Sequence, residues 1–254
     1  MIDVLIPTIG RGTICSTITA LLSSEKVTNF IILDSGEEPI IGSSEVRIMF
    51  DLCARLNKPV KYIREQCSIG KARATLIKAS TSDLALFIDD DVIFEGSQLD
   101  WMAFHFVQNK ELVSYCTPCN WIVTDFLGVE GLDRSPKKLE EIQSIVGDKD
   151  WMFPYFVYDD EHEIKISSCG TQCLLFPPRD VSTDTLNKLS RWKMGYPRED
   201  TLLTSSLYCG LVYTKYTSWH LQTVGKRVEW GKKDTELGYR SVLAGETDFF
   251  TGKE

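Results

Sequence analysis

Short apolar runs and amphipathic stretches alternate through the first ninety residues of the chain. The apolar runs are rich in β-branched and aromatic residues and predict strands, while the segments between them repeat apolar positions at helical spacing. The predicted strands are Val4–Ile6 (closed by Pro7), Phe30–Leu33, Val60–Ile63 and Leu84–Ile88, and the predicted helices are 13–22, 43–56 and 68–79. This strand–helix rhythm indicates a largely parallel sheet with helices on both faces.

The pattern in the second half of the chain is less regular. It predicts helices at 99–112, 139–146 and 202–211, and strands at 112–116 and 170–176. The stretch from Tyr155 to Ile166 alternates about three acidic residues, 159–161, which suggests a hairpin. The tail from Gly225 is weakly patterned, and the sequence contains no internal repeat or convincing linker. We therefore expect a single α/β domain.

Composition supports an ordinary globular protein. The chain has 254 residues, of which 43% are hydrophobic and 25% are charged, enough for a domain with a substantial core. The net charge of −8 removes the simple electrostatic argument for a nucleic-acid partner, although basic clusters occur at 61–73 and 226–233. There is neither an amino-terminal signal pattern nor an apolar stretch of the roughly 18 residues that a bilayer span requires, which predicts a soluble cytoplasmic protein.

The eight cysteines are expected to be reduced in that compartment. Cys116 and Cys119, together with Cys169 and Cys173, could bind zinc. However, these cysteines lie in apolar surroundings without a paired histidine spacing. We interpret them as buried thiols.

Three consecutive aspartates, Asp89, Asp90 and Asp91, stand between the apolar runs 84–88 and 92–94. The carboxyl ends of parallel strands open onto the crevice where α/β sheets bind ligands. Crowded carboxylates repel one another there, and a divalent cation that bridges to an anionic substrate would relieve the repulsion. Asp89 and Asp91 project to one side of an extended chain, and Asp90 projects to the other. A solvated turn is the alternative, which the apolar flanks disfavour.

Other candidate site residues follow predicted strands or begin a predicted helix. Pro7 and Thr8 follow the first strand, and Asp34 follows the second. Gly70 and Arg73 lie near a helix start, where they suit the base, ribose or phosphate of a nucleotide. The simpler interpretations are an exposed helix cation for Arg73 and a turn residue for Asp34.

Glu199 and Asp200 stand just ahead of the last predicted helix. An acid in that position is either a helix N-cap or a base that deprotonates an incoming hydroxyl group. His220 follows an aromatic-rich stretch, where a lone histidine is more often packed than bound to a metal. We interpret the other two histidines, His105 and His162, as structural.

In their order and spacing, these motifs resemble glycosyltransferase family 2, of GT-A fold, from residue 2 to about 222. The motifs are the first strand with Pro7-Thr8, Asp34-Ser35-Gly36, Gly70-x-x-Arg73, Ile88-Asp89-Asp90-Asp91, Gly170-Thr171, Glu199-Asp200 and Trp219-His220. The resemblance implies one GT-A-type domain over 1–254. It would comprise a nucleotide-binding half (1–95), a mixed or antiparallel acceptor and catalytic half (96–222) and a tail (223–254).

The resemblance also implies a role for each motif. Asp89, Asp91 and His220 would hold Mn²⁺ or Mg²⁺ on the diphosphate of the donor. Asp200, next to Glu199, would be the catalytic base. The nucleotide-sugar site would consist of Pro7, Thr8, Asp34, Gly70, Arg73, Asp89, Asp90, Gly170 and Thr171, of which the last two border the donor sugar and the acceptor.

The sequence departs from the family pattern in three places. Arg73 is followed by Ala74, where family members usually have asparagine. The second predicted strand ends in one aspartate, Asp34, in place of a pair, which weakens the case for a uridine base. The Gln-x-x-Arg-Trp signature of processive synthases is missing after Asp200. We therefore expect the transfer of a single sugar.

The expected activity is transfer of a hexosyl or pentosyl unit from a nucleoside diphosphate sugar, with UDP favoured, to an acceptor hydroxyl group. Inversion with Asp200 as base is expected, and retention stays open. A saccharide or lipid-linked glycan is the default acceptor, and a hydroxylated base in DNA is less favoured. One alternative is a sugar-nucleotide nucleotidyltransferase, whose glycine-rich loop residues 10–13 weakly resemble. The other is a non-catalytic sugar-binding module, which the presence of Asp200 and His220 disfavours.

Overall fold

The computed structural model describes residues 1–108, 114–116, 119–121, 135–148, 150, 153, 156–192, 199–207 and 210–221. The strands are β1 (Ile2–Thr8), β2 (Val27–Asp34), β3 (Val60–Arg64), β4 (Leu84–Ile88), β5 (Val92–Ile93), β6 (Ser114–Cys116), β7 (Cys119–Trp121), β8 (Glu163–Ile166), β9 (Cys173–Phe176), β10 (Gly210–Tyr213) and β11 (Ser218–His220). The helices are α1 (Ile14–Leu21), η1 (Ile40–Gly42), α2 (Ser44–Arg55), α3 (Ile69–Ala79), α4 (Gly96–Gln108), α5 (Leu139–Val146), η3 (Pro178–Asp180), α6 (Thr183–Ser190) and α7 (Glu199–Ser206).

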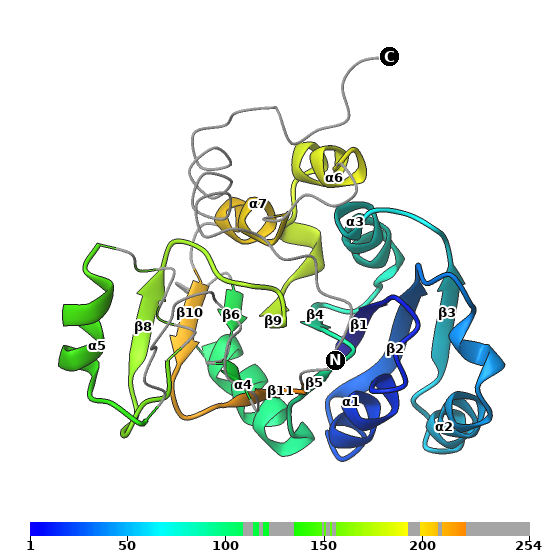
Figure 1. Ribbon diagram of the computed structural model, residues 1–254, viewed down its shortest axis with the longest axis horizontal. Helices are drawn as coiled ribbons and strands as arrows, with labels where there is room; N and C mark the ends of the chain where they lie inside the picture. The colour runs from blue at the N-terminus through cyan, green and yellow to red at the C-terminus, as the bar shows by residue number, and fades with distance from the viewer. Residues whose placement is uncertain are drawn as a thin grey trace.

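The larger sheet of the described chain has eight strands in the order β3-β2-β1-β4-β9-β6-β10-β8 (Figure 1). The neighbours β3, β2, β1 and β4 run parallel to one another. Beyond β4 the sheet is mixed, because β9 pairs antiparallel with both β4 and β6 and β10 pairs antiparallel with β8. The predicted parallel first half and mixed second half are both confirmed.

A smaller sheet connects the end of the described chain to the triple aspartate. Its strand order is β5-β11-β7. β11 pairs antiparallel with β5, which places His220 opposite Val92. Because Val92 directly follows Asp91, this pairing brings His220 beside the aspartates from more than a hundred residues away in the sequence.

Helices cover both faces of the parallel strands (Figure 1). Val4 and Ile6 of β1 belong to the core that contains residues of α1, α2 and α4. Leu5 belongs to the core that contains residues of α3, α6 and α7. Successive side chains of a strand point to opposite faces, and both faces are buried here, so these strands appear in the sequence as continuous apolar runs.

The boundaries of two predicted elements differ from those observed. β1 continues through Pro7 to Thr8, because beyond Leu5 it pairs only with β2, and proline is tolerated where one side of a strand is unpaired. The helix predicted at 99–112 begins at Gly96 and is described to Gln108.

The hairpin predicted between Tyr155 and Ile166 is wrong in the described residues. Glu163–Ile166 forms β8, whose partner is β10. Tyr158 forms an isolated bridge with Lys137. The alternation of exposed and buried residues in β8 is real, but alternation does not identify the partner of a strand.

The remaining predictions concern thiols, the tail and membrane helices. Cys53, Cys169 and Cys173 are buried, whereas the side chains of Cys116 and Cys119 and the tail 223–254 lie outside the described residues. In the described part of the chain, every helix is too short or too polar to cross a membrane.

Candidate active site

The triple aspartate forms a turn between β4 and β5, in which Asp90 and Asp91 are buried. The backbone N–H of Asp89 donates to the carbonyl oxygen of Gln172 at 3.2 Å, and the carbonyl oxygen of Asp91 accepts from the N–H of Leu221 at 2.6 Å. These bonds attach the turn to the segment before β9 and to the end of β11. Asp90 and Asp91 are each only 3% exposed, so the solvated turn considered from the sequence is wrong.

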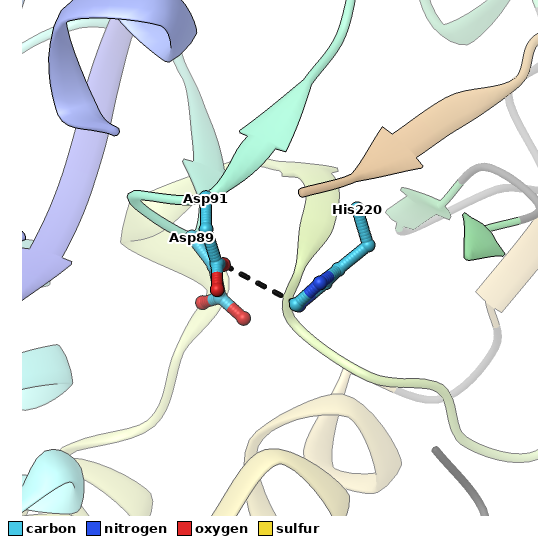
Figure 2. A group of neighbouring side chains, drawn as sticks. All are labelled: Asp89, Asp91 and His220. Atoms are coloured by element: carbon cyan, nitrogen blue, oxygen red, sulfur yellow. Dashed lines mark ion pairs between the residues drawn. The ribbon is translucent and has the colours of Figure 1, made fainter. Parts of the chain in front are cut away.

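Asp89, Asp91 and His220 form a group that could hold a metal ion (Figure 2). One ligand atom from each lies within 4.8 Å of the others, and Nε2 of His220 lies 3.3 Å from Oδ1 of Asp91. Oδ1 of Asp91 is buried and accepts no hydrogen bond among the described residues. Two carboxylates and an imidazole fit a divalent cation such as Mn²⁺. The prediction that Asp89 and Asp91 project to one side is confirmed.

Asp90 makes a different set of contacts. Its Oδ2 accepts a hydrogen bond from Oγ1 of Thr8 at 2.5 Å, and its carbonyl oxygen accepts one from Oγ1 of Thr17 at 3.1 Å. Asp90 therefore ties the turn to the end of β1 and to α1. The nucleotide-binding roles of Thr8 and Asp90 stay predictions.

Arg11, in the loop between β1 and α1, contacts two of the three aspartates. Its Nη1 donates to Oδ2 of Asp91 at 2.5 Å and to Oδ1 of Asp90 at 3.2 Å. The sequence indicated no site role for this residue. The glycines on both sides of Arg11 could have indicated it, but we interpreted this stretch only as a weak resemblance to nucleotidyltransferases.

The carboxylates of the turn carry more negative charge than their neighbours stabilise. Burial raises the pKa of Asp91 to about 7, with Asp89 and Asp90 adding to the rise and Arg11 opposing it. Burial likewise raises the pKa of Asp90 to about 6. The pKa of Asp89 is raised by burial as well, against the opposing charges of Arg73 and Arg11. A bound cation would supply the missing positive charge.

Arg73 connects the turn to α7. It is 5% exposed, so the interpretation as an exposed helix cation is wrong. Its Nη1 forms an ion pair with Oε1 of Glu199, and its Nη2 lies 3.7 Å from Oδ1 of Asp89. Burial lowers the pKa of Arg73, while the charges of Asp89 and Asp200 oppose this change. The predicted contact of Arg73 with a nucleotide is not tested by these bonds and stays a prediction.

Glu199 and Asp200 lie in the first turn of α7. This helix begins three residues earlier than the predicted start at residue 202. Oδ1 of Asp200 accepts the N–H of Thr201 at 2.8 Å. Carboxylates in a first helical turn face the positive end of the helix dipole. Because the charge of Asp200 also acts on both Asp89 and Arg73, this acid lies within electrostatic reach of the group that could hold a metal ion.

Asp34 is fully buried at the end of β2 and is surrounded by donors. Its Oδ1 accepts from the N–H of Gly36 at 2.9 Å and lies 3.3 Å from Arg64. Its Oδ2 accepts from the N–H of Ile40 at 2.9 Å and from the hydroxyl group of Tyr62 at 2.6 Å. These bonds hold the loop after β2, as the turn interpretation proposed, and the nucleotide contact stays a prediction.

Gly70 allows close packing between α3 and α6. A Cβ atom at this position would lie 2.5 Å from Cβ of Trp192 and 2.9 Å from the carbonyl oxygen of Leu189. The absence of a side chain is therefore explained by helix packing. Its predicted nucleotide contact also stays untested.

The remaining predicted site residues lie on strand ends near the turn. Pro7 pairs with Leu33 at the end of β1. Gly170 and Thr171 are buried in the segment before β9, directly ahead of the residue that holds the backbone of Asp89. Oγ1 of Thr171 is buried without a hydrogen-bond partner among the described residues. An unpartnered hydroxyl group at this position is consistent with a ligand contact.

Comparisons with known proteins agree with this geometry. The model of glycosyl transferase family 2 matches residues 3–144, whereas none of the curated proteins compared matches the sequence. S. aureus TarS 1–349 in complex with UDP-GlcNAc superposes with a TM-score of 0.61 at 12% identity, over 96% of this chain and 65% of that one. GalNAc-T7 with UDP, GalNAc and Mn²⁺ superposes with a TM-score of 0.63 at 10% identity, over 96% of this chain and 47% of that one.

These structures share the GT-A fold with the chain, and the chain spans less than two thirds of the length of each. At such identities the likeness concerns the fold alone. The family model, in contrast, matches more than half of the chain, from β1 through the triple aspartate to α5. The protein therefore belongs to glycosyl transferase family 2.

Proposed function

We propose that the protein is a metal-dependent glycosyltransferase that moves one sugar from a nucleoside diphosphate sugar to an acceptor hydroxyl group. The observation that carries the proposal is the group of Asp89, Asp91 and His220, the last two of them buried, with Asp200 within electrostatic reach. Family membership supports the reaction class. The complexes of TarS with UDP-GlcNAc and of GalNAc-T7 with UDP and Mn²⁺ support a UDP-sugar as the donor.

A metal ion held by these ligands would compensate the negative charge of the diphosphate. Mn²⁺ or Mg²⁺ at this position would neutralise the charge that develops on the departing diphosphate. Asp91 would offer Oδ1, which accepts no hydrogen bond among the described residues, and His220 would offer Nε2. Asp90 keeps the turn attached to β1 and α1, so both ligand carboxylates stay on one side.

Asp200 is the proposed base. Its Oδ1 accepts the N–H of Thr201, and we assign Oδ2 to the proton of the acceptor hydroxyl group. The oxygen of the acceptor would then attack the anomeric carbon as the bond to the diphosphate breaks, which inverts the configuration. Glu199 neutralises Arg73 beside it. In this scheme residues 1–95 bind the donor, and the acceptor, a glycan or lipid-linked glycan in preference to a DNA base, approaches from the second half.

The test is a screen of nucleoside diphosphate sugars with Mn²⁺, Mg²⁺ or a chelator, followed by mass spectrometry of candidate acceptors. We expect release of a nucleoside diphosphate only when a divalent cation is present. Asp200→Asn should lower the transfer rate roughly 10²–10⁴-fold and leave donor binding intact. Asp184→Asn is the matched control, because Asp184 lies in the first turn of α6 with an exposed ion pair to Lys188.

The other outcomes assign the chain to a different class. Release of pyrophosphate would identify a nucleotidyltransferase. Saccharide binding without donor turnover would identify a binding module. Near-full transfer by Asp200→Asn would remove Asp200 from the role of base.

A further inference from the structure

Arg11 places a fixed positive charge beside the proposed metal ligands. Its guanidinium group contacts Oδ2 of Asp91, while Oδ1 of the same carboxylate faces His220. It also contacts Asp90, so one cation serves two buried carboxylates. A divalent cation bound through Asp91 would therefore lie within a few ångströms of a charge of the same sign.

Two effects of Arg11 on a metal ion oppose each other. By holding one oxygen of Asp91 it orients the other, and loss of such a supporting contact typically weakens metal affinity roughly 10- to 100-fold. Its charge repels the metal ion. For a divalent cation and a unit charge about 5 Å apart, with an effective dielectric constant of about 20, this repulsion corresponds to a weakening of roughly 10⁴-fold or more. The repulsion is the larger effect, so Arg11 disfavours a metal ion that binds alone.

An anionic ligand reverses this balance. A diphosphate that enters with the metal ion brings negative charge toward both the divalent cation and the guanidinium group, so that the repulsion between the two cations is compensated. Arg11 also has room to adjust. Its side chain is 30% exposed, Gly10 on its amino side has a φ of 93°, and residues 10–12 line a cavity of about 360 Å³ together with residues of the segment 38–46.

We propose that Arg11 couples occupation of the metal site to the donor. Its charge disfavours a divalent cation alone and favours the cation together with a nucleoside diphosphate. The coupling is reciprocal, since the factor by which the diphosphate raises metal affinity equals the factor by which the metal raises diphosphate affinity. The inference rests on the proposed function for the metal site and for the identity of the diphosphate.

The test is a Mn²⁺ titration followed by the electron paramagnetic resonance signal of free Mn²⁺, with and without UDP, at alkaline pH where protons compete least. Arg11→Gln should bind Mn²⁺ alone roughly tenfold or more tightly than the natural protein does. The enhancement of Mn²⁺ affinity by UDP should shrink by a similar factor. Arg11→Lys, which keeps the charge, should remain close to the natural protein in both measurements.

Arg64→Gln is the matched control. Arg64 is 28% exposed and pairs with the buried Asp34 at the end of the neighbouring strand, outside the metal group. It should leave Mn²⁺ affinity almost unchanged, and an equal effect of both variants would overturn the inference as a general charge effect. Weaker or unchanged Mn²⁺ binding by Arg11→Gln would overturn it in favour of an orienting role.

The same titration separates this inference from the proposed function. If neither the natural protein nor Arg11→Gln binds Mn²⁺ with or without UDP, the metal site itself is wrong and both proposals fail. If the natural protein binds Mn²⁺ with UDP but Arg11→Gln shows the same enhancement, only the role of Arg11 fails. Thermal unfolding gives a second measurement, in which Mn²⁺ alone should raise the melting temperature of Arg11→Gln more than that of the natural protein.

Discussion

Asp3, near the amino end of β1, and the triple aspartate, after the carboxyl end of β4, are buried acids at opposite ends of the same parallel strands. They differ in the hydrogen-bond donors around them. Oδ2 of Asp3 accepts from Ser80 Oγ and from the N–H groups of Thr81 and Ser82, and its Oδ1 accepts from Asn29 Nδ2 and Ser82 Oγ, all within 2.8–3.0 Å. Arg11 contacts one oxygen of Asp91, whereas the other, 3.3 Å from Nε2 of His220, accepts no hydrogen bond among the described residues.

The pKa values of Asp3 and Asp91 are therefore shifted in opposite directions although both acids are buried. Burial alone would raise the pKa of Asp3, but hydrogen bonds from Asn29, Thr81 and Ser82 lower it below its ordinary value. Burial raises the pKa of Asp91 to about 7 because its neighbours compensate too little. A buried acid is thus not by itself a sign of function. A buried acid that lacks hydrogen-bond donors does indicate function, because its charge is stabilised only when a cation arrives.

The largest expected effect comes from removing the charge of Asp91. A metal ion contributes several kcal/mol to stabilising a departing diphosphate, so Asp91→Asn should lower transfer by roughly 10³-fold. The unfolding free energy of the metal-free variant should not fall, since a repelling charge has been removed. Sugar transfer and urea unfolding measure the two quantities. Transfer near the natural rate would place the metal elsewhere, and a large loss of stability would make Asp91 a structural acid like Asp3.

Asp3→Ala should show the reverse combination. Removal of a buried carboxylate leaves several donors without their acceptor, and we expect the unfolding free energy to fall by about 3 kcal/mol. Transfer per folded molecule should stay close to normal, because Asp3 lies at the far end of β1 from the site. Asp83→Ala is the control, since its ion pair with Arg179 is exposed and worth little. An equal loss in both variants would contradict the account of Asp3.

The dependence of stability on pH should also have opposite signs for the two regions. The folded-state pKa values of Asp90 and Asp91 lie above the ordinary carboxyl value, so the folded, metal-free protein binds more protons between about pH 4 and 7. Stability should therefore fall as pH rises through that window, by about 1.4 kcal/mol for each unit by which a pKa is raised. The lowered pKa of Asp3 contributes stability that is present above its ordinary value and lost as the solution becomes more acidic.

Urea unfolding in the presence of a chelator, over a series of pH values, measures this difference. The double variant Asp90→Asn, Asp91→Asn should flatten the fall between about pH 4 and 7 and leave the acid-side loss unchanged. Asp3→Asn should remove the acid-side loss and keep the fall. An unchanged slope in the double variant would show that the charge of the turn is compensated by other groups.

The sequence predicts the parallel half of the fold well, because strands buried on both faces produce continuous apolar runs and helices between them keep a single apolar face. It also predicts that Asp89 and Asp91 act together, because residues two apart in an extended chain share a side. It does not predict contacts made by distant pairing. His220 reaches the turn through β11 and β5, and its metal role was predicted only through the family resemblance. The ion pair of Glu199 with Arg73, which joins α7 to α3, was not predicted at all.

Two residues, one in the site and one far from it, show what a local sequence pattern cannot predict. Arg11 is a loop arginine without a periodic pattern, and its importance comes from a carboxylate eighty residues away. Asp3 is an acid within an apolar strand, so its local pattern is as unusual as that of the triplet. Its donors come from β2 and from residues 80–82, and only the structure reveals that they are there.

The smallest expected effect comes from a substitution of Gly70. It tests whether Gly70 is a structural residue, like Asp3, or part of the nucleotide site. Family resemblance assigns it to the nucleotide site, whereas its surroundings in the structure are α6 backbone and Trp192. An added methyl group must displace the carbonyl oxygen of Leu189 and the Cβ of Trp192, so Gly70→Ala should lose about 1–2 kcal/mol of stability despite the better helix propensity of alanine. Gly42→Ala, where a Cβ would meet nothing within 4 Å, is the control and should be nearly neutral. Calorimetric titration with UDP and Mn²⁺ completes the test. Unchanged affinity with lower stability would place Gly70 with Asp3 as a structural residue, whereas lower affinity with unchanged stability would return it to the nucleotide site.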